Sequence, residues 1–200
     1  FGDGKRWGAQ IAYLEEKKPL GTAGALSLLP KNLTKPFLVL NGDVLTRMNF
    51  GQLLEFHEHQ TATATLCVRE HMTRVPYGVV QMDDLQVKTI EEKPMQHHYV
   101  NAGIYLLDPK LLDLVPHDQF FDMPELLEKA IKHHHNVSAF PIHEYWLDVG
   151  HHDLVVPFEG ARLRGAAVRA RAQEGRVRAA DLIGHDDLVV AFEHARLVRL

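Results

Sequence analysis

The sequence predicts a soluble globular protein with an α/β fold and a largely parallel sheet, and three observations support this prediction. Short apolar runs alternate with segments of helical spacing over the first 150 residues. The chain has 200 residues, enough for one domain with a substantial core or for a domain with a small appendage. Its apolar fraction of 46% and charged fraction of 24% are those of an ordinary soluble globular protein.

The first half of this region alternates predicted strands with predicted helices. The strands are short apolar runs, and the segments between them carry apolar residues at helical spacing. A helix that returns the chain to the same edge of the sheet lets consecutive strands run parallel. We therefore expect strands at 11–14 (IAYL), 37–40 (FLVL) and 64–68 (ATLCV), and helices at 23–29 and 50–59.

The second half begins with a hairpin pattern and then returns to strand and helix. Two strands are predicted within 77–94, around the turn formed by two aspartates. A helix is predicted at 123–135, with Asp122 as its N-cap. The remaining strands are expected at 99–108, 137–142 and 145–150.

Residues 151–200 differ in composition from residues 1–150, and we predict that they are an Ala/Arg-rich tail outside the main domain. They contain eight arginines and no lysine, and GHHDLVVPFEGARL (150–163) recurs as GHDDLVVAFEHARL (184–197). Two copies are too few for a solenoid, and the stretch between them favours a solvated helix. We assign the tail no function and consider a fusion segment as its origin. At the other end, the start FGDGKRWG leads us to expect further chain before Phe1.

Charge and hydropathy exclude several classes of partner. The net charge of −4 gives no general attraction to nucleic acid or to an acidic membrane. No apolar run approaches the roughly eighteen residues of a membrane span, and the N-terminus lacks the pattern of a signal peptide. The single cysteine, Cys67, is expected to be a buried strand residue and fits a reducing compartment. We therefore expect a cytoplasmic protein whose partner is a small molecule.

Two aspartates follow short apolar strands and are candidate metal ligands. Asp43 ends the run FLVLNGD, where Gly42 allows close approach of the backbone, and Asp148 lies in YWLDVG. In an α/β sheet the ligand crevice lies outside the carboxyl ends of the strands, and Mg²⁺ is bound through one or two carboxylates. Each aspartate could equally be an ordinary turn residue, and only the fold could bring the two together.

Three further motifs offer groups for a phosphorylated sugar or a nucleotide. In PLGTAGAL, Gly21 and Thr22 put backbone N–H groups and a hydroxyl before a helix, although a tight helix start explains them equally well. In EEKP, Glu92 could accept hydrogen bonds from sugar hydroxyls and Lys93 could meet a phosphate. In NAG, Asn101 can both donate and accept, or can simply mark a bend.

The order of the motifs is more specific than any one of them. G-T-A-G, N-G-D, Y-G, E-E-K-P, N-A-G-I-Y and W-x-D-x-G, over residues 21–150, resemble the sugar-1-phosphate nucleotidyltransferases, also called nucleotide-diphospho-sugar pyrophosphorylases. The resemblance covers about three quarters of the chain. It implies a Rossmann-like nucleotidyltransferase domain over residues 1–150, with a mostly parallel mixed sheet flanked by helices and without the family's first strand and loop.

The resemblance also implies a reaction and its partners. In this family a sugar-1-phosphate oxygen attacks the α-phosphorus of a nucleoside triphosphate, which gives a nucleotide-sugar and pyrophosphate. No protein nucleophile is needed, so positioning and charge neutralisation by Mg²⁺ carry the catalysis. The expected partners are therefore a nucleoside triphosphate and a sugar-1-phosphate, and a homo-oligomer is compatible with the family.

Transferred to this chain, the resemblance assigns a role to each matching residue. Mg²⁺ would be held by carboxylates, the nucleotide would lie near a glycine-rich turn, and a lysine would contact the sugar phosphate. The implied sets are Asp43 and Asp148 for the metal, these two with Lys93 for catalysis, Gly21 and Thr22 for the nucleotide, and Tyr77, Gly78, Glu92 and Asn101 for the sugar.

The chain also departs from the family's pattern, which keeps two alternatives open. The family's first strand and its glycine-rich loop with Arg and Lys have no counterpart here, so we expect a catalytic-domain fragment. A non-catalytic regulatory subunit of the same fold would suit this departure. A nucleotide-sugar-dependent glycosyltransferase is the other alternative, although NGDVL lacks the D-x-D element of that class. The ending WLDVGHH resembles guanylyltransferase-like members that act on mannose- or glucosamine-type phosphates.

Overall fold

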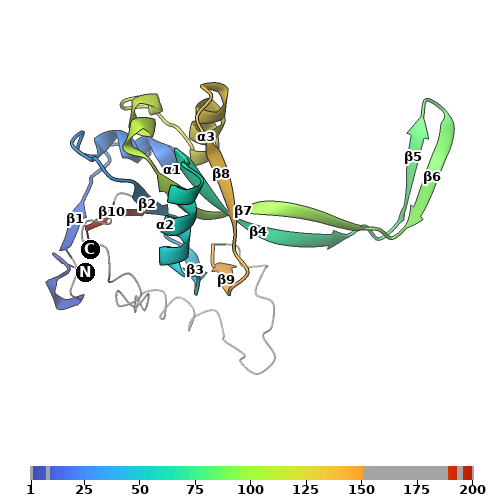
Figure 1. Ribbon diagram of the computed structural model, residues 1–200, viewed down its shortest axis with the longest axis horizontal. Coiled ribbons are helices and arrows are strands. Elements are labelled where there is room, and N and C mark those ends of the chain that lie inside the picture. Colours follow the sequence, from blue (N-terminus) through green and yellow to red (C-terminus); the bar gives the residue numbers. More distant parts are fainter. Residues whose placement is uncertain (1, 8–9, 151–188, 193–195, 200) are drawn as a thin grey trace.

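A seven-stranded mixed sheet organises the structure, a computed structural model that describes residues 2–7, 10–150, 189–192 and 196–199 (Figure 1). Helices cover both of its faces, as predicted for an α/β protein. In spatial order the strands are β1 (Gln10–Tyr13), β11 (Arg196–Arg199), β10 (Val189–Phe192), β2 (Phe37–Leu40), β7 (Met95–Leu107), β4 (Ala64–Arg74) and β8 (Val137–Pro141).

The strand directions correct one prediction, because the sheet is mixed but not mostly parallel. Only β10 with β2 and β4 with β8 pair in parallel, and the other described neighbours are antiparallel. The cause is β7, which lies between β2 and β4 and runs opposite to both. The chain passes from β4 to β7 through a β-hairpin within residues 75–94, without a helix. Such a connection makes the two strands antiparallel, whereas a helical crossover would make them parallel.

The core has two parts, one on each face of the sheet, and β2 contributes to both. All four of its residues are buried, which explains the uninterrupted apolar run. Phe37 and Val39 pack towards the helices that begin at Gly21, Pro109 and Met123, while Leu38 and Leu40 pack towards the helix that begins at Phe50. Burying each such side chain contributes about 1.5–3 kcal/mol. The helices of the described residues are η1 (Lys5–Trp7), α1 (Gly21–Gly24), η2 (Ala25–Leu28), α2 (Phe50–His59), η3 (Pro109–Leu114) and α3 (Met123–Lys132).

Helix ends follow local capping chemistry. The Asn49 side chain caps α2 by accepting from the Gly51 N–H at 2.9 Å. Asp122 is the N-cap of α3, as predicted, and its backbone N–H donates to Glu125 Oε2 at 3.3 Å. The predicted extension of α3 to residue 135 was wrong, because His134 takes a left-handed φ of 61° that ends the helix.

The predicted helix at 23–29 begins two residues earlier, ends one residue earlier and is only partly α-helical. It consists of the single α-turn α1 followed by the 3₁₀ turn η2, and Leu29 is already extended. The Ser27 hydroxyl donates to the Gly24 carbonyl at 2.7 Å within this tightened turn. Pro30 then follows, and a residue before proline is disfavoured in the α region.

An arm projects from the body of the molecule (Figure 1). β4 and β7 are longer than predicted and pair through Arg74 and Met95, well beyond the rest of the sheet. We call this antiparallel ribbon, residues 69–74 with 95–100, the stem. At its end lies the predicted hairpin of β5 (Gly78–Asp83) and β6 (Gln86–Glu92), a separate two-stranded sheet.

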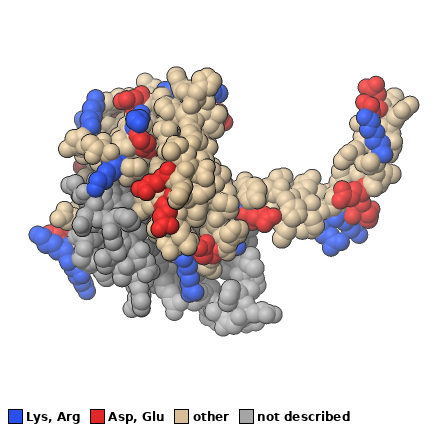
Figure 2. All heavy atoms as spheres, viewed as in Figure 1, with Lys and Arg blue, Asp and Glu red and all other residues tan. Residues whose placement is uncertain are grey.

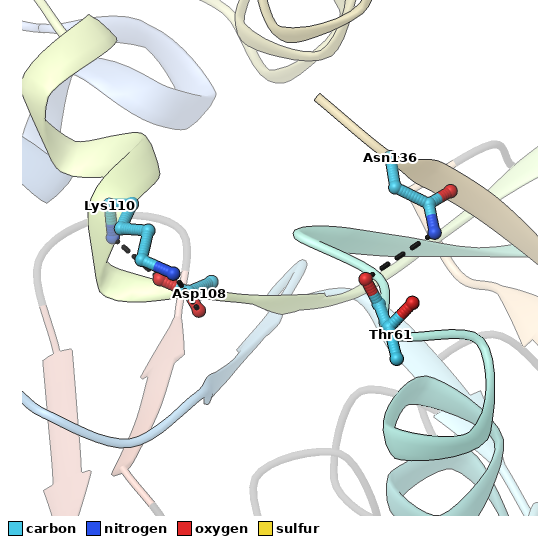
Figure 3. A network of polar contacts seen from close by, with 4 residues as sticks. All are labelled: Thr61, Asp108, Lys110 and Asn136. Carbon is cyan, nitrogen blue, oxygen red and sulfur yellow. Dashed lines mark hydrogen bonds and ion pairs between the residues drawn. The ribbon is translucent and has the colours of Figure 1, made fainter. Parts of the chain in front are cut away.

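Polar contacts close the edge of the sheet where β7 ends and where β4 and β8 begin (Figure 3). Asp108 follows β7, and its carboxylate accepts from the Lys110 N–H at 2.9 Å at the start of η3. Asn136 precedes β8, and its amide donates to the Thr61 carbonyl at 3.4 Å. The carboxyl ends of β2, β4 and β8 lie at the opposite edge, where the ligand crevice of an α/β sheet is expected.

The structure also bears on the predictions for the cysteine, for the C-terminal residues and for membrane spans. Cys67 is fully buried in β4, as expected, and burial raises the pKa of its thiol to about 12. The Ala/Arg-rich stretch and most of the repeat lie in 151–188, outside the described residues. The described part of the tail forms β10, which lies beside β2, and β11, which lies beside β1. Within the described residues, no helix has the length and hydropathy needed to cross a membrane.

Candidate active site

Asp43 lies in the turn that follows β2, at the carboxyl end of the central strand. This turn is fixed against β7, because the Asn41 N–H donates to the Gly103 carbonyl at 2.8 Å. Gly103 has a φ of 69°, and a Cβ there would lie 2.8 Å from Asn41 Nδ2, so only glycine fits the contact. The chain then enters β3 (Val44–Thr46), a short strand that sequence patterns did not predict.

Asp148 is brought to the same place by β9 (Trp146–Asp148). β9 pairs antiparallel with β3, and Val44 lies opposite Asp148. The Val149 N–H donates to the Asp43 carbonyl at 2.9 Å, and the Trp146 indole donates to the Ala102 carbonyl at 2.8 Å. Two aspartates far apart in sequence therefore lie on neighbouring backbone segments.

Gly150 shows that the two carboxylates converge. A Cβ at this position would overlap Asp43 Oδ2 and would lie 3.1 Å from Asp148 Oδ1. The Gly150 N–H donates to Asp148 Oδ1 at 2.8 Å, which orients that carboxylate. Gly150 is therefore a third residue of the site, and its lack of a side chain leaves room for both acids.

The chemistry of this pair fits Mg²⁺. Two like charges this close repel each other, and a divalent cation relieves the repulsion. Among the described residues no group of three His, Cys, Asp or Glu side chains could hold a metal. A pair suits Mg²⁺, which is usually bound through one or two carboxylates and completes its shell with water and phosphate oxygens.

Asn101 is exposed and directly precedes the buried part of β7, two residues before Gly103. Its amide donates to the Tyr105 hydroxyl at 2.7 Å, and its Oδ1 accepts from the Gly103 N–H at 2.9 Å. The side chain is therefore held in one orientation on the same strand segment that anchors the Asp43 turn. Its role towards a sugar stays a prediction.

Gly21 and Thr22 are tied to the start of α3. The Thr22 N–H and hydroxyl donate to Asp122 Oδ1 at 2.9 and 3.2 Å, and the hydroxyl accepts from the Met123 N–H at 2.7 Å. The two following N–H groups donate to the Phe121 carbonyl at 3.0 and 2.9 Å. A tight packing role therefore accounts for this motif, and its contact with a nucleotide stays a prediction.

Replacing Gly21 by Ala is expected to lower the free energy of unfolding by about 2–3 kcal/mol. Gly21 has a φ of 77°, and a Cβ would lie 2.7 Å from Asp122 Oδ1 and 2.8 Å from the Phe121 carbonyl oxygen. Gly2→Ala is the matched control, because Gly2 has a φ of 60° with nothing within 4 Å. Urea unfolding of both variants measures the two free energies of unfolding. Equal losses of stability in the two variants would show that the contact with Asp122 contributes nothing to the loss.

The other predicted site residues lie together at the junction of the stem and the hairpin. The Lys93 N–H donates to the Tyr77 carbonyl at 3.2 Å, and Lys93 Nζ lies 3.8 Å from Glu92 Oε1. Gly78 is the pairing partner of Glu92, and a Cβ on Gly78 would lie 3.1 Å from Glu92 Oε2. Lys93 has a left-handed φ of 49°, a conformation that costs a non-glycine residue about 1–2 kcal/mol.

The structure does not bring this group to the aspartate pair. Figure 1 shows β5 and β6 at the outer end of the arm, while β3 and β9 lie at the body. From Asn101 to Met95, β7 advances by six residue steps, which corresponds to about 20 Å of strand. The predicted site is thus split into a body part with Asp43, Asp148 and Asn101 and an arm part with Tyr77, Gly78, Glu92 and Lys93.

Two residues of the body part were not assigned by sequence reasoning. Asn41 fixes the turn that carries Asp43, and Gly150 accommodates both carboxylates. Both belong to quoted motifs, N-G-D and W-x-D-x-G, so the signal was present. What was missing was the tertiary structure, namely the contact of Asn41 with Gly103 of β7 and the β3–β9 pairing that brings Gly150 to Asp43.

Comparison with known proteins identifies the family. The family model for nucleotidyl transferases matches residues 1–157. A mannose-1-phosphate guanyltransferase of Yarrowia lipolytica is 34% identical over 158 residues, covering 73% of this chain and 42% of that protein. The catalytic subunit beta of mannose-1-phosphate guanylyltransferase from Xenopus tropicalis is 32% identical over 157 residues, with the same coverage. The matched region thus spans less than half the length of these relatives.

Solved structures agree on the fold. HddC from Yersinia pseudotuberculosis, complexed with GMP-PN, matches with a TM-score of 0.50 and 28% identity, over 70% of this chain and 61% of that one. A putative glucose-1-phosphate thymidylyltransferase from Bacillus anthracis matches with a TM-score of 0.56 and 21% identity, over 92% and 70% of the two chains. With a family model that covers more than half of its length, the chain belongs to the nucleotidyl transferase family.

Proposed function

We propose that this protein transfers a nucleotidyl group from a nucleoside triphosphate to a sugar-1-phosphate and releases pyrophosphate. The observation that carries the proposal is the convergence of Asp43 and Asp148 beside Gly150, at the carboxyl end of β2. Membership of the nucleotidyl transferase family supports the same reaction class. The reaction needs no protein nucleophile, so the part that we assign to these residues is to hold a metal ion and to position the substrates.

In the proposed mechanism the protein binds and orients two phosphorylated substrates. A sugar-phosphate oxygen forms a bond to the α-phosphorus, the bond from the α-phosphorus to the bridging oxygen breaks, and pyrophosphate leaves with the electron pair. Mg²⁺ held by Asp43 and Asp148 would supply charge neutralisation at the phosphates. The Asn41–Gly103 contact keeps Asp43 in place, and the Gly150 N–H orients Asp148, so the site needs little reorganisation.

The arm part of the site is proposed to bind the sugar phosphate. Lys93 would meet the phosphate, while Tyr77, Gly78 and Glu92 would border the sugar with Asn101. This role requires the stem–hairpin junction and the aspartate pair to approach each other during the reaction. The left-handed backbone of Lys93 supports a functional role, because strained residues cluster at functional sites.

The substrate pair that we propose is GTP and mannose-1-phosphate, in the cytoplasm. The relatives from Yarrowia lipolytica and Xenopus tropicalis carry the name mannose-1-phosphate guanyltransferase or guanylyltransferase. The HddC structure contains GMP-PN. These names favour guanine over other bases and mannose over other sugars.

Pyrophosphate release by the full-length protein tests the proposal directly. The assay combines each of four nucleoside triphosphates with mannose-, glucose- and glucosamine-1-phosphate in the presence of Mg²⁺. We expect turnover that requires both substrates and is fastest with GTP and mannose-1-phosphate. Fast turnover with another pair would overturn the specificity alone. Binding of substrates without pyrophosphate release from any pair would favour the regulatory subunit.

A further inference from the structure

Arg69 is the first residue of β4 beyond the end of β8. The parallel pairing of these strands ends where Val68 lies opposite Pro141, and the Ile142 N–H then donates to the Val68 carbonyl at 2.8 Å. On its other side, Arg69 pairs with Val100 of β7 at the body end of the stem. Its backbone is therefore held in the ladder, while its half-buried side chain reaches the segment that continues beyond β8.

The Arg69 side chain holds the link between β8 and β9, residues 142–145. Its Nη1 donates to the Ile142 carbonyl at 2.9 Å and to the Glu144 carbonyl at 2.8 Å. The link belongs to neither strand, so its backbone groups need partners outside a strand ladder. A guanidinium suits this task, because one of its nitrogens offers two N–H donors and the group stays charged at any ordinary pH.

The same link leads directly into the strand that carries Asp148. The Tyr145 carbonyl accepts from the Thr46 hydroxyl and from the Arg47 N–H, each at 3.0 Å, and β9 begins at the next residue. Two consecutive residues, Glu144 and Tyr145, are thus tied to β4 and to the β3 segment. Figure 1 shows β9 beside the place where β4 and β7 leave the body.

β9 is too short to fix its own position. It pairs over three residues with β3, and a two-stranded sheet of this size has little stability of its own. The Trp146 indole ties one point of β9 to β7 through the Ala102 carbonyl. Arg69 ties the chain two residues earlier to β4. Two anchors on two different strands fix the direction of β9 as well as its place, and with it the carboxylate of Asp148.

The Arg69 contacts are directed at the backbone and not at an acidic side chain. Both acceptors are peptide carbonyls, so the two hydrogen bonds hold the path of the chain itself. Figure 2 shows charged atoms where the stem leaves the body and at its outer end, with mainly uncharged atoms between them. On the face that it shows, the arm has no charged stripe along its length, which favours a local role for the arginine at the body end.

We propose that Arg69 is a positioning residue for the metal site and acts on Asp148 through the link and β9. The proposal deepens the proposed function and rests on its assignment of Asp148 to the metal. Groups that orient metal ligands without binding the metal typically change metal affinity or activity about ten- to a hundredfold when they are removed. Because Arg69 lies at the body end of the stem, bending that brings the junction to the aspartate pair can leave its contacts in place.

Arg69→Met and Lys129→Met form a matched pair of variants. Arg69→Met removes the N–H donors and keeps an unbranched side chain. Lys129 is also half-buried and donates to a backbone carbonyl, that of Leu114 at 2.7 Å, but at η3 and α3, which pack on the face of the sheet opposite to Trp146. Both variants should lose stability in urea. Only Arg69→Met should bind Mn²⁺ more weakly, by about ten- to a hundredfold, in electron paramagnetic resonance without substrates.

Amide hydrogen exchange tests the route from Arg69 to Asp148. The Val149 N–H, which donates to the Asp43 carbonyl at 2.9 Å, reports on the end of β9, and the Arg47 N–H reports on its start. Both should exchange about tenfold faster in Arg69→Met, because loss of the two charge-assisted hydrogen bonds loosens the link. Arg69→Lys keeps a charged N–H donor and should recover part of the exchange protection and of the Mn²⁺ affinity.

Arg69→Gln provides a second variant if Arg69→Met does not fold. Its amide group is two bonds nearer to the backbone and cannot reach both carbonyls, so the same losses are expected. Parent-like Mn²⁺ binding in whichever of the two variants folds would overturn the proposal. Weaker Mn²⁺ binding with parent-like exchange at Arg47 and Val149 would overturn it as well, because the effect would then not pass through β9.

The positioning role and the proposed activity fail separately. Hydrogen exchange and Mn²⁺ binding are measured without substrates, whereas pyrophosphate release requires both substrates. The expected losses in Arg69→Met, beside a parent protein that releases no pyrophosphate from any pair, would leave the positioning role standing and remove the reaction. Turnover by the parent protein, with Mn²⁺ binding unchanged in Arg69→Met, would do the reverse.

Discussion

Replacing Asp43 by Asn is expected to lower turnover at least about a hundredfold, the scale at which single charge-stabilising groups act in catalysis. The amide keeps the shape of the side chain and the turn after β2, so the fold should be unchanged. It removes one of the two carboxylates that converge beside Gly150. Mg²⁺ affinity should fall with it, because hard cations prefer charged oxygen ligands.

The measurement combines pyrophosphate release over a range of Mg²⁺ with Mn²⁺ binding in the absence of substrates. Asp84→Asn is the matched control: Asp84 lies in the hairpin turn, with a left-handed φ of 50° that Asn tolerates well. The control should keep its turnover and its metal binding. Parent-like turnover and Mn²⁺ binding in Asp43→Asn would remove Asp43 from the metal site.

Much of the α/β layering could be predicted from local patterns. The run FLVL predicted a strand at 37–40, and β2 has these bounds, with all four residues buried. The helical spacing at 50–59 predicted α2 at the bounds that the structure shows. Asp122 predicted the start of α3, because N-capping depends on residues that are neighbours in sequence.

The direction and length of the strands could not be predicted in the same way. Residues 69–74 and 95–100 are mostly polar and show no clear alternation, yet they form the stem because each segment is the other's pairing partner. β3 has three residues and exists through its pairing with β9. Pairing between distant segments depends on the whole fold, and strand propensity alone does not predict it.

The same reasoning explains what sequence could and could not say about the site. N-G-D and W-x-D-x-G each predicted an acid at a strand end, and the β3–β9 pair brings both acids together. E-E-K-P predicted a carboxylate for the sugar hydroxyls and a lysine for the phosphate, and these two side chains lie together at the junction. The stem length separates the two groups, and that length follows from pairing rather than from any motif.

Gly150→Ala is expected to lower turnover about ten- to a hundredfold and to raise the Mg²⁺ concentration needed for half-maximal rate. The added Cβ would overlap Asp43 Oδ2 and lie 3.1 Å from Asp148 Oδ1, so at least one carboxylate must move. Gly150 is not among the described glycines with a positive φ, so the backbone itself tolerates alanine. Stability should change little, because the position is exposed.

Gly51→Ala is the control for this substitution. A Cβ on Gly51 would also lie 3.1 Å from a side-chain oxygen, that of Asn49, but at the start of α2. Turnover and the Mg²⁺ concentration for half-maximal rate should therefore stay near parent values in Gly51→Ala, while Gly150→Ala should have lower turnover and need more Mg²⁺. Displacement of a carboxylate by about 1 Å is enough for such a loss when a metal must be held in fixed geometry. An unchanged Mg²⁺ dependence in a folded Gly150→Ala would mean that the two carboxylates do not act on one cation.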